Sequence, residues 1–187
     1  MIQIETKDIA IKGKHNKDRI AKTIDPTVVA VRDCMQTMPL YAFDTAFQIL
    51  LINKIYLDLD FSFNFTILDS PKCEYKRECV REIDKKIASY KAQDVTKKKY
   101  DDNNITRVET VERLVASKLR CHYCKCEMRI FYSKVRDQTQ WTLDRIDNGL
   151  PHAKENVVIC CLRCNLQRRC QNKDKFLFSK QLKIVKT

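Results

Sequence analysis

The sequence predicts a mixed α+β fold, and three observations support this. Residues 75–91 and 107–119 repeat apolar side chains at three- and four-residue steps, as amphipathic helices do. The segments 141–144 and 157–159 are rich in β-forming residues and are separated by a loop of a dozen residues. Two Cys-x-x-Cys pairs flank these segments. The C-terminal half is therefore predicted to fold as strand, loop, strand and helix, fastened by its cysteines.

The chain divides into three predicted parts. At 187 residues, 44% of them apolar and 32% charged, it can bury a core in one domain or in one domain with an appendage. Only two glycines and four prolines favour a high helix content. A polar break at residues 97–104 is the best domain boundary. We expect an N-terminal region at 1–74, a helix and linker at 75–105, and a C-terminal domain at 106–187.

The N-terminal region has weak strand patterns and many aromatic residues. Residues 2–4 and 28–31 could form short strands, and Phe61, Phe63 and Phe65 alternate with polar residues as in a half-buried strand. Such an aromatic row can stack nucleic-acid bases, but packing in a core is its more common use. The region could serve targeting, self-association or partner binding, and the sequence leaves these alternatives open.

Two helices are predicted before the first cysteine pair. In the first, Ile83, Ile87 and Tyr90 lie on one face, and lysines and arginines fill the other. The second begins with a capping box, in which the side chains of Thr106 and Glu109 each bind the other residue's backbone N–H. A third, shorter helix is predicted over residues 162–171, which contain no helix breaker.

The paired cysteines predict a zinc site. Two thiolates two residues apart can bind one tetrahedral zinc ion with little loop strain, and a second pair completes the four ligands. The predicted ligands are Cys121, Cys124, Cys161 and Cys164. Cys126 and Cys160 adjoin these pairs and could replace a ligand, although the Cys160-x-x-x-Cys164 spacing is less usual. The remaining cysteines, expected to be small apolar residues or free thiols, are Cys34, Cys73, Cys79 and Cys170.

Positive charge is concentrated in the C-terminal part. Residues 107–187 hold 18 lysines and arginines against 8 acidic residues, whereas residues 1–106 hold 18 against 16. A net charge of +10 against +2 indicates a polyanionic partner, either nucleic acid or a phosphate-rich membrane surface. The membrane is the weaker alternative, because the longest apolar run, residues 47–59, is interrupted by polar residues and too short to span a bilayer.

Cysteine usage predicts the compartment. Ten cysteines without a visible secretory signal indicate reduced, metal-binding thiols and not a disulfide framework. We expect an intracellular protein in a reducing compartment, whether nucleus, cytoplasm or viral factory, and not a secreted one.

A patterned segment lies between the cysteine pairs and just beyond them. It comprises Leu143-Asp-Arg-Ile-Asp-Asn148, then Asn156-Val157, then Cys161-x-x-Cys164 followed directly by Asn165. Residues 121–170 thereby resemble an HNH endonuclease of the ββα-metal (His-Me finger) family, in the Asp-Arg-Ile-Asp variant found in phages and large DNA viruses. The resemblance implies a ββα-metal finger and a metal-dependent enzyme that hydrolyses phosphodiester bonds in DNA.

The resemblance also implies roles for three residues. Asp144 matches the carboxylate that binds the catalytic divalent metal, and Asn165 matches the second metal ligand. Asn156 matches the asparagine whose amide holds the loop and the general base in place. Oxygen ligands of this kind suit Mg²⁺ or Mn²⁺, beside a structural zinc ion.

The sequence departs from the family at Arg145, because most relatives have a histidine there as the general base. An arginine cannot act as a neutral base at physiological pH, but it can bind phosphate or stabilise a charged transition state. His152, in the same loop, is the predicted substitute base, because imidazole titrates near neutrality. Asp147 is the other candidate. A loop histidine can also be merely structural or solvent-exposed.

The remaining alternatives concern DNA contact and activity. Arg168 and Arg169 lie beside the predicted metal site, so phosphate contact is favoured over an ordinary solvated face. A DNA endonuclease is the first hypothesis. The alternative is a non-catalytic, zinc-containing nucleic-acid-binding module that kept the fold and lost the base, as Arg145 could indicate. An RNA-directed or virion structural role is a third, weaker possibility.

Overall fold

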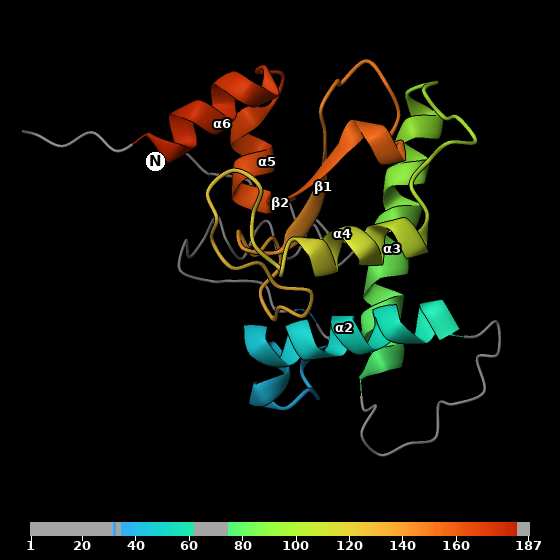
Figure 1. Ribbon diagram of the computed structural model, residues 1–187, viewed down its shortest axis with the longest axis vertical. Coiled ribbons are helices and arrows are strands. Elements are labelled where there is room, and N and C mark those ends of the chain that lie inside the picture. The colour runs from blue at the N-terminus through green and yellow to red at the C-terminus, as the bar shows by residue number, and fades with distance from the viewer. Residues whose placement is uncertain (1–31, 33–34, 62–74, 183–187) are drawn as a thin grey trace, which may run out of the picture.

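The computed structural model describes residues 32, 35–61 and 75–182. These residues form a mixed α+β structure with a two-stranded sheet (Figure 1). The elements, in chain order, are η2 (Leu40–Phe43), α2 (Thr45–Phe61), α3 (Lys76–Thr96), α4 (Arg107–Ala116), β1 (Trp141–Arg145), η4 (Lys154–Asn156), β2 (Val157–Cys161), α5 (Leu162–Arg168) and α6 (Lys173–Gln181). The α+β class predicted from the sequence is therefore confirmed.

The strands predicted in the N-terminal region are not tested. Residues 2–4 and 28–31, together with Phe63 and Phe65, lie outside the described residues. Phe61, predicted to begin a strand, is instead the last residue of α2. That helix is apolar on most of its surface, so its sequence lacks the one-sided pattern from which a helix is usually predicted.

The helices α3 and α4 confirm the periodicity of their sequences. Helix α3 extends to Thr96, five residues beyond the predicted end. Helix α4 begins at the predicted capping box: the backbone N–H of Glu109 donates to Oγ1 of Thr106, and the Thr106 N–H donates to the Glu109 carboxylate at 2.9 Å. Both helices bury their apolar faces against the rest of the chain, as amphipathic helices do.

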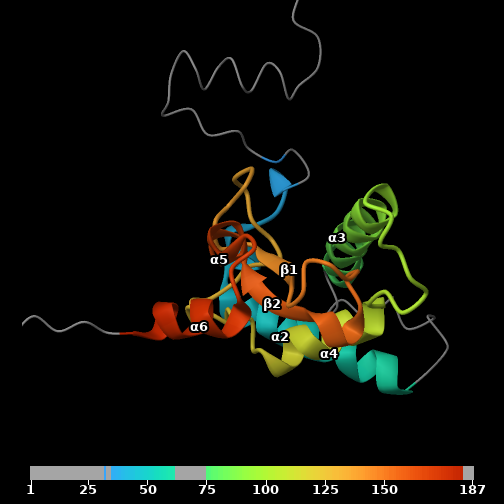
Figure 2. The ribbon, with the colours of Figure 1, turned by 90° about the horizontal axis from the view of Figure 1, so that it is seen from above.

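The strands β1 and β2 form an antiparallel hairpin that leads directly into α5. Trp141 pairs with Cys161 at one end, and Arg145 pairs with Val157 at the loop end. The predicted order of strand, loop, strand and helix is therefore confirmed. In two perpendicular views the hairpin lies between α5 on one side and α3 on the other (Figures 1 and 2).

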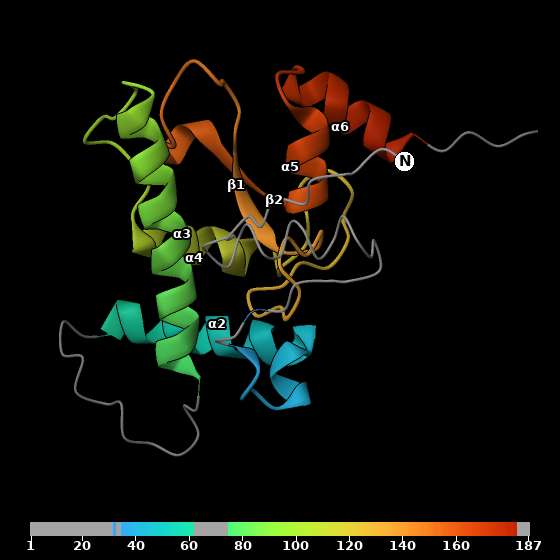
Figure 3. The same cartoon turned by 180° about the vertical axis from the view of Figure 1, so that it is seen from behind.

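One apolar core joins the helices to the hairpin. Side chains of α2, α3, α4 and both strands belong to the same buried cluster, with Trp141 and Leu143 of β1 among its largest members. Seen from behind, α3 crosses the helices α2 and α4 (Figure 3). Among the described residues, this cluster contains side chains from both sides of residue 105, where the sequence predicts a domain boundary.

A buried glutamine ties α2 to the segment before β1. Gln48 is fully buried, and its Oε1 accepts the N–H groups of Ile130 and Phe131 at 2.7 and 3.2 Å. Its Nε2 donates to the carbonyls of Ala42 and Phe131 at 3.0 and 3.3 Å. Both ends of the amide are satisfied, as burial of a polar group requires.

None of the described helices combines the length and apolar content that crossing a lipid bilayer requires.

Candidate functional site

Four cysteines converge at the base of the hairpin. The ligand atoms of the predicted set all lie within 4.8 Å of one another; the set is Cys121, Cys124, Cys161 and Cys164. The first pair sits in a tight turn, closed by a hydrogen bond from the Cys121 N–H to the Cys126 carbonyl at 2.9 Å. The second pair spans the junction of β2 and α5, where the Cys164 N–H donates to Sγ of Cys161.

The spacing of these sulfur atoms fits a tetrahedral metal ion. Zn–S bonds of about 2.3 Å place the sulfurs of a tetrahedron roughly 3.8 Å apart, and Sγ of Cys124 lies 3.8 Å from Sγ of Cys161. Hydrogen bonds from the thiols of Cys121 and Cys164 lower the pKa of Cys161 to about 3, so the cluster already favours a thiolate. The four cysteines can therefore hold a metal ion.

The two neighbouring cysteines do not belong to this set. Cys160 points to the other side of β2, where its sulfur lies 3.4 Å from Oγ1 of Thr142. Successive side chains of a strand face opposite ways, so Cys160 and Cys161 cannot both face the cluster. Cys126 adjoins the cluster but is not one of the four converging thiols. The choice of Cys161 over Cys160 is confirmed.

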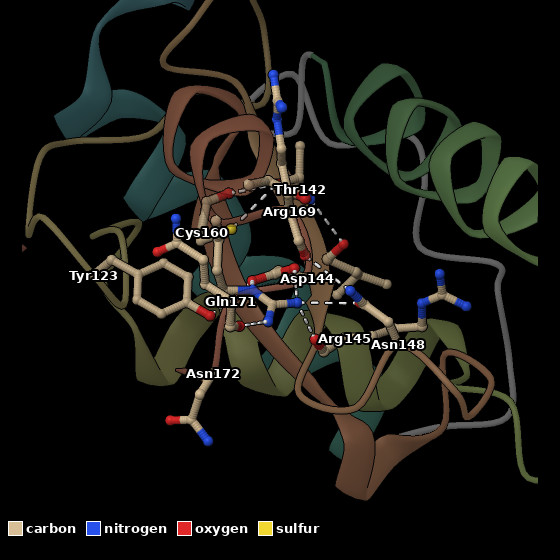
Figure 4. Close-up of polar contacts among 12 residues, drawn as sticks. Tyr123, Thr142, Asp144, Arg145, Asn148, Cys160, Arg169, Gln171 and Asn172 are labelled. Carbon is tan, nitrogen blue, oxygen red and sulfur yellow. Dashed lines mark hydrogen bonds and ion pairs between the residues drawn. The ribbon is translucent and has the colours of Figure 1, made fainter. Parts of the chain in front are cut away.

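Asp144, the predicted metal ligand, is buried and already has partners (Figure 4). Nε and Nη2 of Arg168 donate to its two carboxylate oxygens, at 2.5 Å to Oδ2 and 2.8 Å to Oδ1. The hydroxyl of Tyr123 donates to Oδ2 at 2.7 Å. Burial, followed by this hydrogen bond, raises the pKa of Tyr123, so the phenol keeps its proton. The Asp144 carboxylate is thus held by one cation and one neutral donor.

The sequence predicts a phosphate contact for Arg168, and the structure corrects this. The Arg168 side chain is 1% exposed, and its guanidinium also donates to Oδ1 of Asn148 and to the backbone carbonyls of Arg145 and Gln171. A buried guanidinium needs such partners, because an unpaired buried charge is costly. Arg168 therefore holds Asp144 and the loop after β1, whereas Arg169 next to it is exposed.

The two predicted asparagines are fixed by the strands and the loop. The amide nitrogen of Asn165 donates to the Leu143 carbonyl at 3.2 Å and to Oγ1 of Thr142, which places this side chain on β1 beside Asp144. Asn156 holds the loop: its Oδ1 accepts from the N–H of Asp147, and its Nδ2 donates to the carbonyls of Asp147 and Pro151, all at 2.9 Å.

Two oxygens of this side of the hairpin could serve a hard divalent cation. Oδ1 of Asp144 accepts one hydrogen bond, from Arg168, and a carboxylate oxygen has room for a second partner. The side-chain oxygen of Asn165 accepts no hydrogen bond from any described residue. One oxygen from each residue fits Mg²⁺ or Mn²⁺ that keeps several waters. The charge of Arg168 on the same carboxylate opposes a second cation.

His152, the predicted general base, is buried against α3. Its ring Nδ1 lies 2.9 Å from both carboxylate oxygens of Asp94, and its backbone N–H donates to the same group at 2.8 Å. The ring of Tyr90 packs against the imidazole at a tilt of 34°, with centroids 4.6 Å apart. The histidine is 4% exposed and Asp94 is fully buried, so this is not the solvent-exposed loop histidine that the sequence also allows.

The protonation states follow from these contacts. Burial raises the pKa of Asp94, but hydrogen bonds from His152 and the charge of Arg145 outweigh burial, so the pKa lies below its usual value. Burial lowers the pKa of His152, and the hydrogen bond and charge of Asp94 oppose this without overcoming it. At neutral pH the pair is therefore a charged carboxylate and a neutral imidazole.

Arg145 belongs to the same group as His152. Its Nη1 donates to the Leu150 carbonyl at 3.2 Å and lies 3.4 Å from Oδ1 of Asp94. Its partners thus differ from those of Asp144, the preceding residue, as alternation along a strand requires. The structure divides the predicted residues into an α5-side group of Asp144, Asn165 and Arg168, and an α3-side group of Arg145 and His152. Asp147, the other candidate base, binds the N–H of Gly149 within the loop.

Sequence reasoning missed Asp94, although a signal was available. Asp94 follows Tyr90 by four residues and so continues the apolar stripe of α3, which includes Ile83 and Ile87. An acidic residue in an apolar stripe is expected to have a buried partner. The partner, His152, lies 58 residues away in sequence and could not be identified from spacing.

Comparison with known proteins gives no relative from which these roles could be transferred. No protein-family model matches the chain, and neither a curated protein nor a solved structure matches it.

Proposed function

We propose that the C-terminal part of this protein is a zinc-stabilised, HNH-type endonuclease that hydrolyses phosphodiester bonds in DNA. The observation that carries the proposal is the hydrogen bond from the Asn165 amide to the Leu143 carbonyl, which holds a side chain of α5 on the strand that contains Asp144. An amide of the following helix on the strand that carries the aspartate is what the resemblance to this family leads one to expect.

The zinc ion is proposed for the four-cysteine cluster. Four thiolates in tetrahedral reach of one centre favour zinc, and a closed set of four protein ligands is typical of a structural site. The ion would fasten the turn at residues 121–126 to the junction of β2 and α5. Zinc in such a site contributes directly to folding.

DNA is proposed as the substrate because of charge. Residues 107–187 carry a net charge of +10, and a basic surface binds the phosphate backbone without regard to sequence. Arg169 is exposed beside the α5-side group. Arg145 uses Nη1 for its two contacts, and its other guanidinium nitrogens have no partner among the described residues. RNA is a weaker alternative.

In the proposed reaction, residues on one side of β1 bind the metal ion, and residues on the other side bind phosphate and accept a proton. Asp144 and Asn165 would hold Mg²⁺ or Mn²⁺, which supplies stabilisation of negative charge on the scissile phosphate and its leaving oxygen. Arg145 would bind a phosphate oxygen from the other side. His152, neutral at physiological pH, would accept a proton from the attacking water.

A plasmid assay tests this proposal. Supercoiled DNA is incubated with full-length protein and Mg²⁺ or Mn²⁺, with EDTA as the control. Nicking is expected to disappear in Asp144→Asn, which keeps the shape of the side chain and removes its charge. Asp174→Asn, on the exposed start of α6, is the matched control and should nick normally. Zinc content and melting temperature of both variants confirm folding, so nicking unaffected by Asp144→Asn would exclude Asp144 as the metal ligand.

A second candidate is a non-catalytic DNA-binding module, and one observation favours it. The two hydrogen bonds from Arg168 to Asp144 supply a positive charge where the catalytic metal would need to bind. In that case the Asp144–Arg168 pair is a structural pair, and the resemblance is one of fold alone. DNA retardation without nicking under any metal would support this candidate over the first.

A further inference from the structure

A carboxylate that the nuclease resemblance does not include lies beside the α3-side group of Arg145 and His152. Asp94 is fully buried near the end of α3, and its oxygens face His152, Arg145 and Asn104. The contacts to His152 are the closest of these, at 2.8 to 2.9 Å. A buried, charged carboxylate therefore has the imidazole as its main partner.

These contacts determine which ring nitrogen of His152 carries the proton. An ionised carboxylate only accepts hydrogen bonds, so Nδ1 beside it must be the protonated nitrogen of the neutral imidazole. Nε2 is then unprotonated, and it accepts no hydrogen bond from any residue that the structure describes. This is the tautomer that a general base needs, since the free lone pair receives the proton.

The orientation of the ring is fixed as well as its tautomer. The backbone N–H of His152 binds the same carboxylate, so Asp94 holds the residue at two points. The Tyr90 ring packs against the imidazole, and the Tyr90 hydroxyl accepts the N–H of Leu143 in β1. The histidine is thereby held relative to the strand that ends in Asp144 and Arg145.

We propose that Asp94 is a positioning residue for His152, which it holds as the Nδ1–H tautomer so that Nε2 can act as the general base. The proposal rests on the proposed nuclease function. Nε2 takes a proton from the attacking water as the water oxygen bonds to phosphorus. The bond from phosphorus to the leaving oxygen breaks, and the leaving oxygen keeps the electron pair and takes up a proton from solvent. Asp94 does not touch the substrate and keeps its charge throughout.

The first test reads the tautomer without reference to activity. Long-range ¹H–¹⁵N NMR of full-length protein near neutral pH distinguishes the two ring nitrogens, and His152→Ala identifies the signal among the three histidines. The wild-type ring is expected to carry its proton on Nδ1. Asp94→Asn replaces one acceptor oxygen by an NH₂ donor facing the ring, so the proton should shift toward Nε2. A wild-type ring protonated on Nε2 would overturn the proposal.

The second test measures coupling between the two residues. Asp94→Asn should lower the single-turnover cleavage rate on the order of 10²-fold or more, with the KM unchanged because Asp94 touches no substrate. In the His152→Ala background the same change should cause no further loss, since its effect passes through the imidazole. Asp84→Asn, also on α3 and paired with Arg107 at the surface, is the matched control and should be neutral in both backgrounds.

The outcomes separate this proposal from the proposed function. A wild-type protein that never nicks DNA refutes the nuclease and, with it, the catalytic role of Asp94. A wild-type protein that nicks, while Asp94→Asn reduces the rate equally with and without His152, refutes the positioning role alone and leaves Asp94 as a structural link. Melting temperatures of all the variants identify a loss that is due to unfolding.

Discussion

The buried carboxylates on the two sides of β1 have different partners. On the α5 side, Asp144 and Arg168 are buried and bind each other through two hydrogen bonds. On the α3 side, Asp94 is also buried, but its main partner is a neutral histidine, and part of the nearby Arg145 guanidinium has no partner in the described part of the chain. A carboxylate paired with a cation is a stable structural pair, whereas a carboxylate paired with an imidazole leaves a group that can take up a proton. We therefore expect the α5 side to dominate stability and the α3 side to dominate proton transfer.

Loss of the proposed zinc ion should disrupt the structure on both sides of β1 at once. Cys164→Ser removes one ligand where β2 meets α5, and zinc in such peptides binds with an apparent free energy of about 10–16 kcal/mol. The C-terminal part is expected to lose its zinc and unfold, as measured by metal analysis and circular dichroism. Cys170→Ser changes an exposed, free thiol and should have no effect. Full zinc loss from a protein that stays folded would show that the hairpin does not depend on the metal.

The next largest effect should be a difference in stability between variants of two neighbouring arginines. Arg168→Ala leaves the buried Asp144 without its cation and should cost about 3–5 kcal/mol of unfolding free energy. Arg169→Ala changes an exposed side chain and should remain within about 0.5 kcal/mol. Urea denaturation followed by tryptophan fluorescence measures both, because the single tryptophan, Trp141, lies in β1. Equal costs for the two variants would contradict the pairing of Arg168 with Asp144.

The role proposed for the α3 side predicts a specific dependence of the cleavage rate on pH. Only neutral His152 can accept a proton, and burial lowers its pKa below the usual value of about 6.5. The cleavage rate should therefore remain constant through neutral pH and fall only as the pH drops through that lowered pKa. His152→Ala should lose on the order of 10²–10⁴-fold in rate at neutral pH.

Arg145→Ala provides the contrast, because the arginine does not titrate in this range. Its loss of rate should be the same at every pH, and DNA affinity should fall with it. A rate that instead rises through a pKa above 6.5 would point to a metal-bound hydroxide as the base, and normal cleavage by His152→Ala would point to Asp147 or that hydroxide.

The smallest expected effect concerns salt. DNA affinity should fall steeply with salt if the basic C-terminal part binds phosphates. Neutralising Arg169 should reduce the slope of log affinity against log salt by about one contact. Because Arg168 is buried, its loss in a protein that remains folded should leave the slope unchanged. Filter binding across a salt series measures this, and a change of about two contacts for the double variant would return Arg168 to the DNA-binding surface.

Local patterns in the sequence predicted much of the fold. The Cys-x-x-Cys spacing, the capping box at Thr106 and the β-forming triplet at Val157 depend on neighbours a few residues away, and the structure has all three features. Helix α2 was missed because its apolar residues surround the axis and give no periodic signal. The sequence therefore predicts helices whose exposed face is polar better than a helix such as α2, which also exposes the apolar residues Leu50 and Leu57.

The candidate site was less predictable, because charge pairs form between distant residues. Arg168 and Arg169 are identical in type and adjacent, yet only the helix geometry of α5 directs the first onto Asp144. Asp94 lies 58 residues from His152, and no spacing rule links them. The residue types indicated which chemical groups the site contains. The tertiary contacts determine which of these groups are already paired within the protein.

The buried amide of Gln48 has a consequence for how this protein tolerates change. Three of its four hydrogen bonds require one position of α2 against residues 130–131, so a shift of the helix by a single turn would leave several polar groups unsatisfied. Helix α2 is thus matched to the segment before β1 in position and not merely in hydrophobicity. A homologue that exchanged this helix for another apolar helix would have to place an amide at the same point, because the backbone groups of Ile130 and Phe131 would otherwise lose their partner. Inheritance of α2 and residues 130–131 as one unit is the expected evolutionary pattern.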